Sequence, residues 1–306
     1  MSDSPRYYTP GFKPNSMPVS ELYQKALAEL VTPPPSVPIT RFPSLQKALG
    51  GLRPHEFTLF CGSTGTGKTT LMANLSADLI EQGVKHFVAS VETGWADFIK
   101  RGLSCFARED LNRGESISLA KAKAIHAEYG KHFQNNTLEL ALYDSRIPIR
   151  DLLATLEYFA DLGHKVAIID NLNFLLDVQD DRNVTRETDS VIHELVVLCK
   201  RVPMHVIMLC HPRKTDDNRV EDPLHIKGSS TAAQEASNVL LLNHPHPYAL
   251  EQGLADKFHR ELLIGKVRRR GRYVNTRILF NSTDGATYTE GETYYVPYNY
   301  SAKNRR

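Results

Sequence analysis

The stretch Gly62-Ser63-Thr64-Gly65-Thr66-Gly67-Lys68-Thr69 matches the phosphate-binding pattern G-x-x-x-x-G-K-[ST] in full. It follows an apolar run over residues 57–61 and precedes a helical pattern over residues 69–82. Glycines let the main chain turn tightly and direct its N–H groups at phosphates, and the following helix adds the positive end of its dipole. In this pattern the lysine reaches the β- and γ-phosphates and the final hydroxyl holds Mg²⁺. We therefore expect residues 62–69 and Thr70 to bind a nucleoside triphosphate. A glycine-rich turn with an incidental lysine is the alternative.

The composition is that of an ordinary globular protein, with 41% hydrophobic and 24% charged residues in 306. A net charge of +2 means that any nucleic-acid binding must depend on local patches. The four cysteines are widely spaced, which favours reduced thiols over disulfides or a zinc site. No apolar run approaches the roughly 20 residues of a membrane span, and the N-terminus lacks a signal-peptide pattern. We expect a cytoplasmic protein without a membrane partner, in the host cytoplasm if the protein is viral, with an organelle as the open alternative.

The chain divides into three predicted parts. Residues 1–40 combine a flexible arm, an amphipathic helix from Ser20 to Leu30 with Ser20 as N-cap, and a stiff proline-rich linker. That helix could dock on a neighbouring subunit or on its own domain, and the sequence leaves both open. Residues 41–290 form one domain, and residues 291–306 form a C-terminal tail.

Apolar runs and helical patterns alternate from residue 41 onward. Continuous apolar strands separated by helices indicate a mainly parallel sheet with helices on both faces, which is an α/β fold. After residue 238 the strands follow one another with little helix, which favours antiparallel strands at one edge. The predicted strands are 57–61, 86–91, 138–143, 165–170, 205–210, 239–243, 261–266 and 277–280; the predicted helices between the first five are 69–82, 95–107, 117–130, 149–162 and 185–200.

Three apolar runs end in a polar residue of interest, because ligands of such sheets gather at the carboxyl ends of the strands. Asp170 is expected to hold Mg²⁺ opposite Thr69, although an aspartate can also cap a turn. Glu92 is expected to polarise the attacking water as a general base, or else to cap the next helix. His211 is expected to contact the γ-phosphate and report hydrolysis, or else to be structural.

The segment from Lys266 to Arg272 packs five cations into seven residues. One arginine could reach a neighbour's γ-phosphate and compensate charge in the transition state, with the others forming a phosphate-binding patch or a solvated turn. Two long polar loops, residues 177–188 and 212–230, also leave strand ends. The second carries both signs of charge and is either a single-stranded DNA loop, through main-chain amides and cations such as Arg213, Lys214 and Lys227, or a plain surface loop.

Together these motifs resemble the helicase domain of the hexameric replicative helicases of the DnaB, Twinkle and phage primase-helicase group, from about Phe42 to Thr289. The resemblance rests on the lead-in at 42–54, the P-loop, Glu92, Asp170, His211, the segment 226–238 and the Lys-x-Arg…Gly element at 265–271. It implies a RecA-like fold that uses ATP, or another NTP or dNTP, with Mg²⁺.

The resemblance also implies site residues and partners. Arg268 would be the finger that acts across the subunit interface, with Lys266 as its companion, and Phe280 would lie near the aromatic that stacks on the base. Gly228 and Ser229 would contact DNA with the cations of the second loop. The helix before the linker looks like the family's subunit-exchanging helix. No primase domain is present, so a separate primase is expected, and the basic C-terminus gives no ground to assume the polymerase contact of some relatives.

The expected function is an NTP-driven, ring-forming motor, most simply a hexamer, that translocates on single-stranded DNA and unwinds duplex DNA in the 5′–3′ direction as a stand-alone replicative helicase. The alternative is a RecA/RadA-like recombination ATPase that forms filaments on DNA. A small-molecule kinase is disfavoured, because such enzymes need a lid and a substrate pocket.

Overall fold

The computed structural model describes residues 16–112, 116–142, 147–176, 184–212, 219–223, 226, 230–270, 276–282 and 286–297. The chain forms two compact units, Met1–Pro35 and Ser36–Arg306. The first contains helix α1 (Val19–Val31), in which no residue is buried. This helix begins one residue before the predicted start, with Pro18 at the N-cap position and no side-chain cap, so the prediction that Ser20 caps it is wrong.

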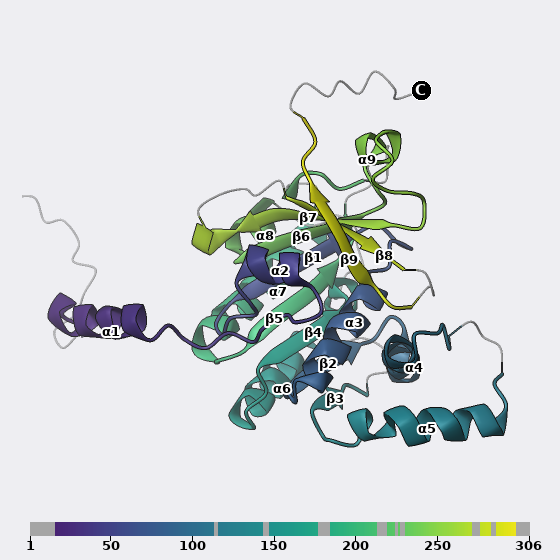
Figure 1. Cartoon of the computed structure of the whole chain (residues 1–306). Helices are drawn as coiled ribbons and strands as arrows, with labels where there is room; N and C mark the ends of the chain where they lie inside the picture. The colour runs from purple at the N-terminus through teal and green to yellow at the C-terminus, as the bar shows by residue number, and fades with distance from the viewer. Residues whose placement is uncertain are drawn as a thin grey trace, which may run out of the picture. The chain divides into compact units, whose positions relative to one another are not determined.

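The second unit is built on a sheet of nine strands in its described part (Figure 1). The strand order is β3-β2-β4-β5-β1-β6-β7-β8-β9. The first six strands in this order are parallel and the last three are antiparallel, as predicted for the C-terminal edge. Their bounds are β1 (Phe57–Gly62), β2 (His86–Ser90), β3 (Leu138–Leu140), β4 (Val166–Asp170), β5 (His205–Cys210), β6 (Asn238–Asn243), β7 (Arg260–Val267), β8 (Arg277–Asn281) and β9 (Thr289–Tyr294).

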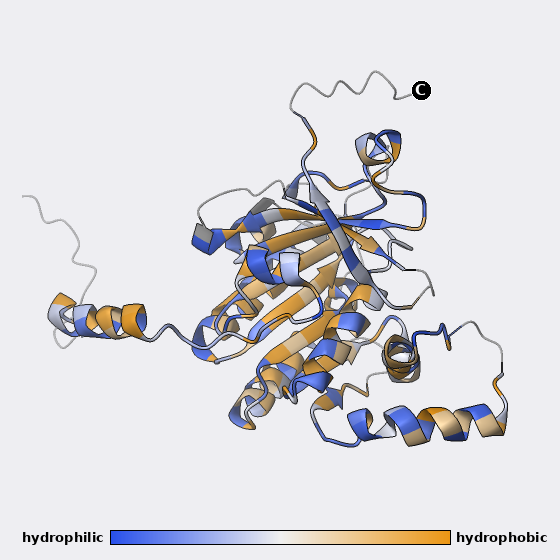
Figure 2. Cartoon of the chain, in the orientation of Figure 1, coloured by the Kyte–Doolittle hydropathy of each residue, from blue (hydrophilic) through white to orange (hydrophobic). Residues whose placement is uncertain are grey.

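Helices cover both faces of this sheet because successive strand side chains point to opposite sides. On β1, Phe57, Leu59 and Cys61 pack with α6 (Ile149–Asp161) and α7 (Val184–Arg201). Phe60 faces the other way, toward α2 (Pro43–Leu49) and α3 (Lys68–Glu81). Figure 2 shows the central strands as apolar and β9 as largely polar, consistent with its exposed edge position. The remaining helices are α4 (Gly94–Ala107), α5 (Leu119–Phe133), α8 (Ser230–Glu235) and α9 (Pro247–Glu251), with short 3-10 turns η1 (Leu172–Leu175) and η4 (Arg268–Arg270).

The eight predicted strands and the five predicted helices between them are confirmed, with ends that differ by at most three residues. The boundary after residue 290 needs correction, because it cuts through β9, and Tyr294 of that strand is buried against the domain. The start of the domain also moves toward the N-terminus, to Ser36. Val37 pairs with Leu52 there, and the main-chain N–H of Thr40 donates to Asp78.

Among the described residues, no helix has both the length and the apolar character needed to cross a bilayer. The four cysteines all lie in described segments; each is buried and none forms a disulfide.

Candidate active site

The P-loop joins β1 to α3 on a rigid support, because every residue of β1 is buried between β5 and β6. Gly65 and Gly67 adopt φ values of 80° and 90°, which side chains other than glycine rarely tolerate. The ammonium of Lys68 folds back over the loop and donates to the carbonyls of Gly62 (2.8 Å) and Ser63 (3.1 Å). Burial lowers the pKa of Lys68, and the nearby carboxylates of Asp170 and Glu92 oppose that shift.

Asp170 ends β4 directly beside the first turn of α3. Its Oδ2 accepts a hydrogen bond from the Thr69 hydroxyl at 2.6 Å. Its Oδ1 is buried and has no hydrogen-bond partner among the described residues. Burial raises the pKa of Asp170 to about 6, while the bond from Thr69 and the charge of Lys68 favour the ionised form. A buried carboxylate oxygen without a donor, next to a hydroxyl, fits the oxygen ligands that Mg²⁺ prefers.

Glu92, Asn171 and His211 meet beside Lys68, each from the end of a different strand. The Asn171 amide donates to Glu92 Oε2 and lies 3.2 Å from His211 Nε2. His211 Nε2 is 3.8 Å from Glu92 Oε2, and His211 Nδ1 is 3.5 Å from Lys68 Nζ. The Glu92 side chain remains 38% exposed, so water can reach it. The structure thus brings together all the strand-end residues predicted from sequence and adds Asn171 as the group that links them.

Two arginines that the sequence did not single out also contact the P-loop. Arg260 of β7 donates from Nε to the carbonyl of Thr66 at 3.1 Å. Arg101 of α4 donates from Nη1 to the hydroxyl of Thr70 at 3.0 Å. The hydroxyl of Tyr288 lies against Gly67, where a Cβ would have no room. No local pattern marks these residues, because their approach to the loop depends on strand register and helix packing.

Lys266 and Arg268 lie at the end of the sheet where the parallel strands begin, opposite to the end that carries the P-loop. Because β7 is antiparallel to β6, Val267 pairs with Asn238 at the start of β6, whereas Gly62 pairs with Leu242 near its end. A strand of this length separates the two edges by about 17–20 Å. Within the chain the two cations instead bind carbonyls at the end of α8: Lys266 Nζ donates to Ala233, Gln234 and Ala236 (2.7–2.9 Å), and Arg268 Nη2 donates to Gln234 and Glu235 (2.8 and 2.7 Å).

The prediction that Phe280 stacks on the base is wrong for this structure. The ring has 0% exposure and packs edge-to-face against Phe42 at 5.2 Å and against Tyr288 at 6.0 Å between centroids. Strand alternation directs it into the core under α2, so neither of its faces is available to a ligand. The predicted DNA contacts Arg213, Lys214, Lys227, Gly228 and Ser229 lie outside the described residues.

The strand order, the P-loop and the strand-end cluster define a RecA-like P-loop NTPase. The sequence profile described as "DnaB-like helicase C terminal domain" matches residues 39–286, which is most of the chain. The chain therefore belongs to the family of DnaB-like helicase C-terminal domains, and is an ATP-binding, ATP-hydrolysing helicase domain.

Solved structures agree on the fold. A solved ATPase domain superposes with a TM-score of 0.73 at 15% identity, over 91% of this chain and all of that one. A DnaB-like replicative helicase, solved in a study of its interactions with primase, gives a TM-score of 0.71 at 15% identity, over 90% of this chain and 67% of that one. The RadB recombinase is less similar, with a TM-score of 0.53 at 18% identity, over 83% of this chain and 97% of that one.

Proposed function

We propose that this domain is an NTP-driven motor that assembles into a ring, most simply a hexamer, translocates along single-stranded DNA and unwinds duplex DNA in the 5′–3′ direction. The observation that carries the proposal is the cluster of Glu92, Asn171 and His211 beside Lys68. It places a carboxylate suited to act as a base, a histidine suited to contact the γ-phosphate and the P-loop lysine together at the carboxyl ends of the strands. One of the similar structures comes from a study of a replicative helicase and its interactions with primase, and we propose a separate primase as a partner here.

In this proposal each residue of the cluster has one task. Lys68 turns from the loop carbonyls to the β- and γ-phosphates, and Glu92 accepts a proton from the attacking water. His211 contacts the γ-phosphate, and when hydrolysis removes that phosphate the change at His211 moves the segment that follows β5. Thr69 and Asp170 hold Mg²⁺, which would neutralise charge on the β- and γ-phosphate oxygens. The orphaned Oδ1 of Asp170 supports this assignment.

Arg268 acts on a neighbouring subunit in this proposal. Its position at the far edge of the sheet keeps it away from the P-loop of its own chain. A ring in which that edge of one subunit faces the P-loop edge of the next would bring the guanidinium to the γ-phosphate, with Lys266 beside it.

The apolar side of α1 would dock on an adjacent subunit of the same ring.

A strand-displacement assay tests the proposal. Partial duplexes that carry either one single-stranded 5′ arm or one single-stranded 3′ arm are offered with each NTP and dNTP in turn, and Lys68→Ala protein serves as the control. We expect strand displacement from the substrate with the 5′ arm, on which the protein loads, and we expect it to require hydrolysable nucleotide and Mg²⁺. Nucleotide hydrolysis without displacement of either substrate would contradict the motor function and leave an ATPase of another kind.

A RecA/RadA-like recombinase is the second candidate, favoured by the likeness to RadB. It is the weaker one, because the helicase profile spans residues 39–286, and because the DnaB-like helicase and the solved ATPase domain superpose better. Negative-stain images with nucleotide and single-stranded DNA separate the two. Closed rings support the helicase, whereas open helical filaments support the recombinase.

A further inference from the structure

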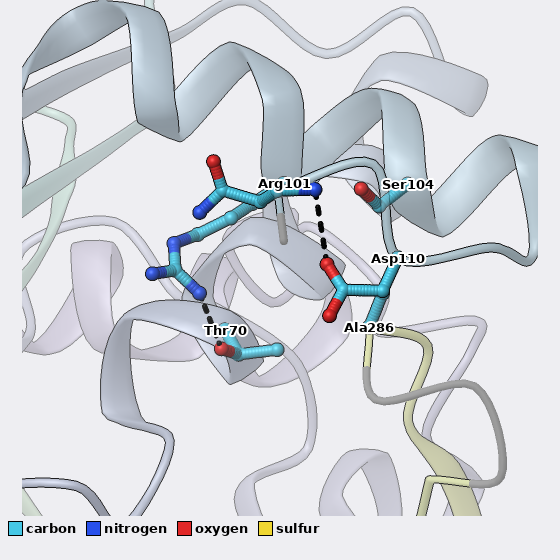
Figure 3. A pocket seen from close by; sticks show the side chains of 6 residues that line it. Thr70, Arg101, Ser104, Asp110 and Ala286 are labelled. Carbon is cyan, nitrogen blue, oxygen red and sulfur yellow. Dashed lines mark hydrogen bonds between the residues drawn. The ribbon is translucent and has the colours of Figure 1, made fainter. Parts of the chain in front are cut away.

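A polar cavity of about 220 Å³ lies beside the first turn of α3, outside the cluster described above. Its walls come from three parts of the chain: the P-loop helix, the end of α4 with the turn after it, and the segment that leads into β9. Figure 3 shows the side chains around this space, with Arg101 spanning from α4 toward Thr70. The lining residues are Thr70, Arg101, Ser104, Asp110, Asn112 and Ala286.

Hydrogen bonds hold these walls in place without a ligand. The Ser104 hydroxyl donates to the Lys100 carbonyl (2.7 Å) and accepts from the main-chain N–H of Leu111 (3.0 Å), which fixes the turn after α4. The main-chain N–H of Asn112 donates to Asp110 Oδ1 at 3.0 Å. The cavity is therefore preformed in this part of its wall.

The third wall is fixed to the P-loop helix itself. The side chain of Asn74 in α3 donates to the carbonyl of Ala286 at 2.9 Å and accepts from the main-chain N–H of Tyr288 at the same distance. Because one helix carries the phosphate-binding turn and this wall, the distance between the cavity and the bound phosphates is set by α3.

The position of the cavity matches the end of the nucleotide that carries the sugar. Thr69 faces Asp170, and Glu92 and His211 complete the γ-phosphate end. Thr70 is the next residue of α3 and is turned about 100° around the helix, toward Arg101 and the cavity. A triphosphate whose γ end lies at the strand-end cluster leaves its nucleoside at the other end of the loop.

Size and donors agree with part of a nucleotide rather than a whole ligand. Pockets that bury complete small molecules span about 300–1,000 Å³, so a cavity of 220 Å³ suits one portion of a larger ligand. Arg101 Nε is buried and has no hydrogen-bond acceptor among the described residues. An oxygen of the sugar or of the α-phosphate would supply that acceptor.

We propose that this cavity receives the sugar and base of the bound nucleoside triphosphate, with Asp110 and Asn112 as residues that discriminate among nucleotides. A carboxylate accepts hydrogen bonds from sugar hydroxyls or from an exocyclic amino group, and a carboxamide both donates and accepts. The inference rests on the placement of the γ-phosphate at the strand-end cluster, which belongs to the proposed function, and adds which residues choose the nucleotide.

The test compares wild-type protein with Asp110→Asn, Asn112→Ala and the control Asp161→Asn, which changes an exposed aspartate at the end of α6. Steady-state hydrolysis without DNA is measured for the four ribonucleotides and their deoxy forms. Inorganic tripolyphosphate is included as an inhibitor that lacks sugar and base. Ribose against deoxyribose separates hydroxyl recognition from base recognition, and ATP against GTP, CTP and UTP reports on the base.

The expected result is a KM increase of about tenfold for the preferred nucleotide in the Asp110 and Asn112 variants, the size of one lost hydrogen bond to a charged or polar group. Preference among nucleotides shrinks, while kcat, the inhibition constant of tripolyphosphate and the Asp161→Asn control stay unchanged. Unaltered preference in both cavity variants overturns the inference, and so does equal weakening of tripolyphosphate and nucleotides. Because no DNA is present, a failure to unwind duplexes leaves this result unaffected.

Discussion

At the scale of single residues, the proposed role of Lys68 requires its side chain to move. Its ammonium is occupied by two loop carbonyls and must turn outward when phosphates arrive. We predict that Lys68→Ala lowers the rate of phosphate release by about 10²–10³-fold, the usual cost of removing one preorganised charge-stabilising donor. Phosphate release with saturating Mg²⁺ and nucleotide measures it. Turnover within a few-fold of wild type would show that the loop is not the catalytic nucleotide site.

Glu92 should separate binding from chemistry. A general base acts on the water and not on the phosphates, so Glu92→Gln should keep nucleotide affinity and lose about 10²–10⁴-fold in hydrolysis. Affinity is measured by equilibrium titration and hydrolysis by phosphate release. The matched control is Glu139→Gln, which changes an exposed residue of β3. If Glu92→Gln hydrolyses as fast as the control, the carboxylate only caps the following helix.

At the scale of elements, two strands begin with a buried histidine. Burial lowers the pKa of His86 at the start of β2, and of His205 at the start of β5, from 6.5 to about 4. In each ring Nδ1 lies 2.9 Å from a main-chain carbonyl. Nε2 lies beside a hydroxyl, of Ser76 (2.7 Å) and of Thr58 (2.9 Å) respectively. The neutral imidazole can donate from Nδ1 to the carbonyl and accept at Nε2 from the hydroxyl, whereas protonation would put a hydrogen on Nε2 and end its role as an acceptor.

These histidines predict acid sensitivity. Between about pH 6.5 and 4 each of these histidines binds a proton in the unfolded chain but not in the folded chain, so its contribution to the free energy of unfolding falls as pH drops through this window. Each histidine contributes roughly 3 kcal/mol to the loss. Urea unfolding from pH 7.5 to 4.5 measures the slope, and His86→Gln or His205→Gln should each reduce it. If both variants keep the wild-type slope of the free energy of unfolding against pH, groups other than these two histidines cause the acid sensitivity.

The antiparallel edge depends on the buried carboxylate of Glu261, the second residue of β7. It accepts from Arg277 Nη1 (2.5 Å) and Arg219 Nη2 (2.8 Å), and also from the hydroxyl of Tyr294. Burial raises the pKa of Glu261 and the two arginines lower it, with a net result below the usual value. The carboxylate therefore stays ionised and joins β7 to three other segments, which carry Arg219, Arg277 and Tyr294.

Removing that carboxylate takes away the buried ion-pair partner of both guanidinium groups and leaves them to share the exposed carboxylate of Glu221. We predict that Glu261→Ala costs about 3–5 kcal/mol of the free energy of unfolding, as for other broken buried ion pairs. Chemical denaturation measures it, with the exposed salt bridge variant Glu157→Ala as control, expected to cost less than about 1 kcal/mol. Equal costs for the two variants would mean that the Glu261 contacts stabilise the fold no more than an exposed salt bridge does.

Elements were more predictable from the sequence than contacts were. Apolar runs bounded by breakers fix strands and helices locally, and the parallel strand ends necessarily gather Glu92, Asp170 and His211 at one edge. Arg101, Arg260 and Tyr288 could not be found this way, because register and helix packing alone bring them to the P-loop. Phe280 was misplaced because the resemblance aligned its position in the chain but not the face of β8 on which it lies.

At the scale of the whole molecule, the proposal that Arg268 acts on a neighbouring subunit makes a testable prediction about mixtures. Lys68→Ala and Arg268→Ala proteins should each lack DNA-stimulated hydrolysis. Mixed rings of the proposed kind would contain some interfaces with an intact Lys68 and an intact Arg268, so mixing should restore part of that activity. The measurement is phosphate release against mixing ratio. Arg268→Ala protein with a normal rate but salt-sensitive DNA binding would assign the arginine to a phosphate-tracking patch instead.

The arrangement of β1 has a consequence during protein synthesis. The strand that carries the P-loop emerges early, yet both of its neighbours come much later: Phe57 pairs with Val206 in β5, and Thr58 pairs with Asn238 in β6. At about 5–20 residues per second, a ribosome needs roughly 10 to 40 s to pass from one strand to its last neighbour. Both edges of β1 stay unpaired until β5 emerges, and one stays unpaired until β6 emerges, so a nascent chain should need protection from aggregation and should be unable to bind nucleotide until most of it has been translated.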